Sequence, residues 1–404
     1  MKNLGTLYKY ELKKLLRRPL SWALVLVMAV FCAYSIFRFG VSSGSGMLLP
    51  ILDEDGNETG EEQFIPEEEI QAVKREAAGK LNGKVMDDAF FREMLEAVPD
   101  IPFPQLEVYF LTEDATYLHP YSLVEGLFPD ARTVTEEEFY DRIWEQTQAS
   151  FERWDLSGGE KAYWTQQASR IEKPFVYQDY WRGLDRAFDT VYTFFTFLPV
   201  AAAACLCTIF SEDRRTRVDA LVFASRESRL PLYLAKVLAG ITVAALAAAV
   251  IIGAVAGALL YVWGTDGLNA PLQMYDTVSP RPVTVGQVFL PIILLLVLFT
   301  LVYGGLTMLV SALTHNSLAA LAGPVLLCFM MQYFYYHAQE AGRWGDYFRQ
   351  YLMGYYGVNN LRLVNLFGLY LDNYQFGSLL YGAAAALLMA VCWLGWRRSA
   401  AGRG

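Results

Sequence analysis

Long apolar runs alternate with short charged segments along most of the chain. Six runs of about 20 residues or more carry almost no charge, at 20–38, 189–210, 232–263, 285–313, 317–336 and 377–396. A run of that length crosses a hydrocarbon core of roughly 30 Å at about 1.5 Å per residue. Buried helices of a soluble protein would rarely produce six such runs. The pattern therefore predicts an all-α polytopic membrane protein with six transmembrane helices.

One long polar segment, residues 39–188, separates the first apolar run from the second. It holds 31 of the 42 acidic residues but only 13 of the 33 basic ones. Thr135 with Glu138, and Ser157 with Glu160, have the S/T-x-x-E spacing of a capping box, which starts a helix. We expect a large, mainly helical domain with its own core.

Basic residues concentrate in the short segments that join the apolar runs. Fifteen Lys and Arg, against five Asp and Glu, lie in the segments 1–19, 211–236, 314–316 and 397–404. Because Lys and Arg are retained on the cytoplasmic side during insertion, we expect both termini to lie in the cytoplasm. The membrane that we expect the chain to span is the cell (plasma) membrane. The polar domain at 39–188 is then extracytoplasmic.

Residues 1–19 combine leucines at helical spacing with six basic residues. This predicts an amphipathic helix in the membrane interface, with membrane lipid as its partner. A cleavable signal peptide is the alternative, but the basic region is long and no small-x-small cleavage site ends the run after it. Residues 338–375 are aromatic and sparsely charged, which predicts short helices in the outer interface.

Motifs that carry chemistry are few. The sequence LSGGE at 156–160 matches the signature of ABC ATPases, but no phosphate-binding loop precedes it, since the nearest candidate, GKLNGKV, ends in Val85. We interpret LSGGE as the capping box of Ser157 and Glu160. All five cysteines lie in apolar runs, and Cys205 and Cys207 are roughly 200° apart on a helix, so we expect no disulfide and no metal site. Nor do we expect a nucleic-acid partner.

Gly253 and Gly257 form a G-x-x-x-G pair on the third apolar run. Small residues let membrane helices approach closely, so these glycines are candidates for helix packing. The packed helix is either in the same subunit or in a second one.

The segment at 211–231 carries the most specific pattern. It contains Phe210-Ser211-Glu212, an acid before leucine in Asp219-Ala220-Leu221, and a turn ending in arginine, Ala224 to Arg229, before Lys236. This resembles the ABC-2 membrane family, the permease subunits of ABC exporters, in which such a loop is the coupling helix that docks on an ATPase. The order of elements along the whole chain is similar too. Arg217 departs from the pattern, because it stands where such permeases commonly have Gly.

The resemblance implies the transmembrane permease subunit of a bacterial, ATP-driven ABC exporter. Its partners would be a separate ABC ATPase subunit, which binds ATP-Mg, and a second permease subunit in a homo- or heterodimer. The chain itself would then be no enzyme and bind no cofactor. The residues that the resemblance places at the ATPase contact are Glu212, Asp219, Arg226 and Arg229. The substrate stays open between peptide, lipid and drug, and the alternative function is a membrane sensor or signalling protein with a ligand-binding outer domain.

Overall fold

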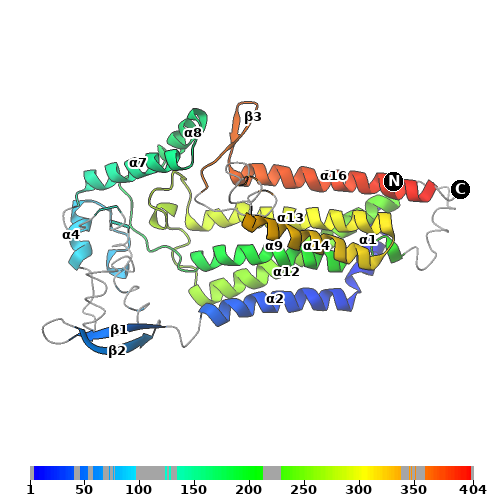
Figure 1. Cartoon of the computed structure of the whole chain (residues 1–404), viewed down its shortest axis with the longest axis horizontal. Coiled ribbons are helices and arrows are strands. Elements are labelled where there is room, and N and C mark those ends of the chain that lie inside the picture. The colour runs from blue at the N-terminus through cyan, green and yellow to red at the C-terminus, as the bar shows by residue number, and fades with distance from the viewer. Residues whose placement is uncertain are drawn as a thin grey trace.

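The chain separates into a long helical bundle and a smaller group of helices and strands at one end of it (Figure 1). The structure is a computed structural model, and it describes residues 4–40, 46–52, 58–66, 78–96, 134–212, 229–337 and 360–401, with isolated positions between these ranges. Both termini lie at the opposite end of the bundle, near helix α1 (Leu4–Leu16). We call that end the basic end and the other the outer end.

Six long helices of the described chain run side by side in the bundle. They are α2 (Pro19–Gly40), α9 (Leu184–Leu206), α12 (Arg229–Trp263), α13 (Val285–Thr314), α14 (Ser317–His337) and α16 (Asn373–Ala401). Helix α9 packs against α2, α12, α13 and α14, and α13 also packs against α16. Ala201, Ala202 and Ala203 of α9 are fully buried. Their small side chains let the surrounding helices approach this central one closely.

Four of these helices are long and apolar enough to cross a membrane, namely the segments Pro19–Arg38, Leu230–Trp263, Val285–Thr314 and Asn373–Arg397. The apolar parts of α9 and α14 are shorter, at Phe194–Leu206 and Ser317–Met331. Large hydrophobic side chains such as Leu26, Val30 and Phe31 of α2 are more than half exposed. Such a surface fits lipid rather than water. The chain is a helical polytopic membrane protein.

The outer end contains α4 (Asp88–Glu96), α7 (Glu136–Arg153) and α8 (Gly158–Ala168). Both capping boxes are confirmed. The Thr135 and Ser157 side chains accept hydrogen bonds from the N–H groups of Glu138 and Glu160, and the carboxylates of these glutamates accept hydrogen bonds from the N–H groups of Thr135 and Ser157 in return. LSGGE is therefore a helix start here. Phe90, Phe139 and Tyr177 are buried at 1% exposure or less and give this region an aromatic core.

The expectation of an all-α chain needs a correction, because two antiparallel hairpins occur. Strands β1 (Gly46–Leu52) and β2 (Glu58–Pro66) pair apolar residues across the sheet, Met47 with Ile65 and Leu48 with Phe64. Strands have a period of two residues rather than 3.6, so helical periodicity does not reveal this sheet.

The second hairpin, β3 (Val364–Leu366) and β4 (Leu369–Leu371), lies where short helices were expected. Its turn residues, Phe367 and Gly368, have φ of 54° and 92°, and the Gly368 N–H donates to the Asn365 side chain at 2.7 Å. Two left-handed residues make the tight turn that joins paired strands. Helix α16 follows at once, because the Asp372 side chain accepts from the Gln375 N–H at 2.8 Å and caps it.

The outer end is tied to the bundle by side chains that bond backbone carbonyls. Thr147 of α7 donates to the Val278 carbonyl at 3.1 Å, Trp181 donates to Gly264 at 3.0 Å, and Trp164 of α8 donates to Leu361. Arg281 lies between these segments, 7% exposed, and pairs with Asp372 at 3.3 Å. α7 and α8 are thus anchored to the loops that enter α13 and α16.

Candidate functional site

The amphipathic helix α1 is anchored to α12 by a buried ion pair. The Lys236 ammonium lies 2.9 Å from the Glu11 carboxylate, and their side chains are 1% and 6% exposed. Lys236 also donates to the Ile209 carbonyl at 3.3 Å, just after α9. Because a buried charge is stable only when it is paired and hydrogen-bonded, Lys236 holds α1, α12 and the end of α9 in one arrangement.

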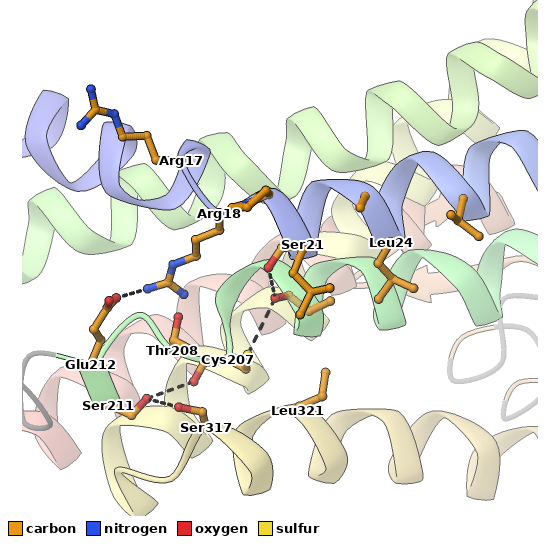
Figure 2. A pocket seen from close by; sticks show the side chains of 15 residues that line it. Arg17, Arg18, Ser21, Leu24, Cys207, Thr208, Ser211, Glu212, Ser317 and Leu321 are labelled. Carbon is orange, nitrogen blue, oxygen red and sulfur yellow. Dashed lines mark hydrogen bonds and ion pairs between the residues drawn. The ribbon is translucent and has the colours of Figure 1, made fainter.

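A second ion pair joins α1 to the other end of the charged loop. Arg18, at the corner between α1 and α2, donates to the Glu212 carboxylate, and the Lys14 ammonium lies 3.6 Å from it. Figure 2 shows Arg18 reaching across to Glu212. These side chains are 18–27% exposed, so this pair is more accessible than the Glu11–Lys236 pair. The segment 211–236 is therefore bound to α1 near both of its ends.

Hydroxyl groups connect the end of α9 to the turn between α13 and α14. Ser211 and Ser317 share a hydrogen bond of 2.8 Å, and Ser311 donates to the Cys207 carbonyl at 3.0 Å (Figure 2 shows the first of these). The Phe210 N–H in turn donates to the Ser311 hydroxyl at 3.3 Å. The basic end thus forms one polar network across α1, α9, α12, α13 and α14.

This arrangement joins one loop to several helices, which suits the transmission of movement. The model of the ABC-2 family transporter proteins matches residues 6–342, from α1 through α14. This chain belongs to the ABC-2 family. It is therefore a transmembrane component of an ABC transporter, in a family whose members associate with an ABC ATPase and are not themselves catalytic. No curated protein and no solved structure matches it.

Of the four residues proposed for ATPase contact in this ABC-2 protein, two lie within the described structure and two lie outside it. Glu212 is engaged by Arg18 and Lys14 within the chain. Arg229 is the first residue of α12. Asp219 and Arg226 lie outside the described residues. The ATPase contact stays a prediction for all four.

The glycines proposed for helix packing are both exposed on α12. No described atom lies within 4 Å of the position that a Cβ would take at Gly253 or Gly257. Within the described chain, then, no neighbouring helix packs on this glycine face. The packing role of Gly253 and Gly257 stays a prediction, both for contact within the subunit and for contact with a second one.

Sequence reasoning missed the pairing of Glu11 with Lys236 and of Arg18 with Glu212. A signal for the first pair was present, because Glu11 is the only acid among the first 19 residues and Lys236 is the only charge in the run 232–263. A charge that cannot reach water needs a partner of opposite sign. Two isolated charges of opposite sign are a signal for such a pair, although the sequence does not show that their two segments are neighbours.

Proposed function

We propose that the chain is the permease subunit of an ABC exporter, driven by a separate ATPase subunit that docks on residues 211–236. The observation that carries the proposal is the attachment of this segment to α1 near both ends, through Glu212 and Lys236. A displacement of either attached end would therefore move α1 with it.

The covalent connections extend this movement to three helices. Helix α1 ends at Leu16 and α2 begins at Pro19, so only Arg17 and Arg18 separate them. The loop itself continues α9 on one side and enters α12 on the other. A push by the ATPase on the loop would therefore shift α2, α9 and α12 together, which is the kind of rigid-body change that opens a transport path.

The charge distribution supports a cytoplasmic position for the basic end. α1, the segment 211–236 and residues 397–404 carry an excess of Lys and Arg, as cytoplasmic segments do. ATP is available on that side. In this orientation six helices cross the membrane of a bacterial cell, residues 39–188 lie outside, and the exposed Gly253 face meets a second permease subunit.

Co-purification with the ATPase tests the proposal. The full chain is expressed with the ATPase of its own operon, and the amount of bound ATPase and its ATP hydrolysis are measured. Exchanging the charges at Asp219→Lys and Arg226→Glu should reduce the bound ATPase about tenfold, because unlike charges at an interface become like charges. The matched control is Arg397→Glu, an exposed residue near the end of α16 that is not on the loop.

Equal ATPase binding by the loop variant and the wild type would contradict docking at 211–236. Equal losses in the loop variant and the Arg397→Glu control would indicate a general charge effect instead. If no nucleotide-hydrolysing subunit binds the wild-type chain at all, the exporter proposal fails and the sensor hypothesis is favoured.

A further inference from the structure

A cavity of about 840 Å³ opens at the basic end, between the start of α2, the end of α9 and the start of α14. One side of the cavity is polar and includes Arg17, Arg18 and Thr208. The other side is apolar, with Leu24 of α2 and Leu321 of α14. Figure 2 shows the division, with the charged groups on one side and the leucines on the other.

The charge at the polar part is positive. The described lining contains one carboxylate, that of Glu212, which Arg18 and Lys14 already pair with. Arg17 is a further exposed cation of the lining, and no described residue forms an ion pair with it. The lining thus has two cations, Arg17 and Arg18, against one carboxylate, and the Lys14 ammonium lies 3.6 Å from that carboxylate; this excess of positive charge favours an anion at this position.

The Thr208 hydroxyl gives an independent indication of a ligand. Its Oγ1 is buried and has no hydrogen-bond partner among the residues that the structure describes, and Thr208 lines the cavity. Other threonines of the bundle donate to the carbonyl four residues earlier, as do Thr190, Thr242, Thr300, Thr307 and Thr314. A buried hydroxyl without a partner is costly, so this one is suited to an oxygen that the cavity receives. Figure 2 shows it directed toward Arg18.

The apolar part of the cavity continues along α2. Val27 lines both this cavity and a second hollow of about 410 Å³, whose other residues include Val30 and Phe31. From Pro19 to Val30 the helix rises about 16 Å at about 1.5 Å per residue. That is close to half of a hydrocarbon core of roughly 30 Å, the depth that the acyl chains of one leaflet fill.

We propose that this cavity binds an anionic phospholipid of the leaflet at the basic end. Its phosphate would contact Arg18 and the Thr208 hydroxyl, with the exposed Arg17 adding positive charge nearby, and one acyl chain would lie along Leu24 and Val27 of α2. The lipid would thus join the α1–α2 corner to the end of α9, next to Glu212. This site does not depend on the ATPase partner.

Lipid binding to the full chain in detergent tests the site. The delipidated protein is titrated with phosphatidylglycerol or phosphatidylcholine of identical acyl chains, and bound lipid is counted by native mass spectrometry. We expect phosphatidylglycerol to bind at least about tenfold more tightly. Inorganic phosphate alone should not displace it, because the acyl chain supplies part of the affinity.

Three variants locate the site. Arg17→Gln should weaken phosphatidylglycerol binding about fivefold through loss of one cation, and Thr208→Val should do so by a similar factor through loss of one donor. Thr208 is partly buried and Arg17 is exposed, so both variants should fold. Arg397 is an exposed arginine near the end of α16, at the basic end of the bundle. Arg397→Gln should leave phosphatidylglycerol binding unchanged.

Several outcomes would overturn the proposal. These are equal binding of the two lipids, complete competition by inorganic phosphate, or a loss in Arg397→Gln as large as in Arg17→Gln. The proposal would also be refuted if Leu24→Cys formed a cross-link between two copies of the chain and phosphatidylglycerol no longer bound, because this face would then be a subunit interface.

Discussion

At the outer end of the bundle Arg281 pairs with Asp372 but is also enclosed by two aromatic rings and a backbone carbonyl, whereas at the basic end Lys236 and Arg18 pair with carboxylates 225 and 194 residues away. The Arg281 guanidinium lies 4.7 Å from the Trp164 ring centre and 5.5 Å from that of Tyr374, and it donates to the Asn360 carbonyl at 2.9 Å. The Glu11–Lys236 contact instead joins two side chains 225 residues apart.

The difference concerns which contacts tolerate movement. A planar guanidinium between two rings, with a backbone carbonyl as acceptor, has one good position. An ammonium on a flexible stem keeps its attraction to a carboxylate over a range of positions. We infer that the outer end holds the domain at a fixed angle, while the basic end transmits displacement between α1, α9 and α12.

The largest effect on stability is expected from separating Glu11 and Lys236. Lys236→Met leaves the Glu11 carboxylate buried and unpaired, which should lower the free energy of unfolding by roughly 3–5 kcal/mol. The double variant Glu11→Gln with Lys236→Met removes both charges and should recover most of that loss. Denaturant unfolding in detergent of the wild type, the two single variants and the double variant forms a double-mutant cycle. Strictly additive effects would mean that the buried pair is not the contact that holds α1.

A smaller effect is expected at the outer end. Arg281→Lys keeps the charge but loses the planar contact with Trp164 and the separate N–H groups that reach Asn360 and Asn373. We expect a loss of about 2 kcal/mol in the free energy of unfolding, with ATPase binding unchanged.

The control for this variant is Arg153→Lys, at an exposed position in the last turn of α7, which should change stability by less than about 0.5 kcal/mol. A loss of ATPase binding in Arg281→Lys would show that the outer end also takes part in coupling. The contrast between the two ends would then be wrong.

The parts of the fold that the sequence predicts are those set by local spacing. The capping boxes at Thr135 and Ser157 depend on residues three positions apart, and the family resemblance of the 210–236 segment depends on one short pattern. A helix start of this kind is specified by residues that are close together in the sequence. The family match confirms the second prediction.

The parts that it misses depend on residues far apart in the chain. The Glu11–Lys236 pair, the cavity beside Thr208 and the position of Arg281 each require knowing which helices are neighbours. The β3–β4 hairpin was missed for another reason, because aromatic and leucine-rich residues suit either a strand or an interfacial helix, and the turn at Phe367 and Gly368 decides between them.

The smallest effect on stability is expected at Glu212, and this variant gives the sharpest test of the contrast. Its ion pairs are partly exposed, so Glu212→Gln should cost about 1 kcal/mol or less, and high salt should remove most of that difference. The matched control is Glu152→Gln, which loses an exposed pair with Lys161 at the outer end. If the basic end transmits movement, only Glu212→Gln should lower ATP hydrolysis in the complex, although neither variant changes stability much. Equal hydrolysis in both variants would show that the Arg18–Glu212 pair is not part of the coupling path, and would leave Lys236 as the link between the loop and α1.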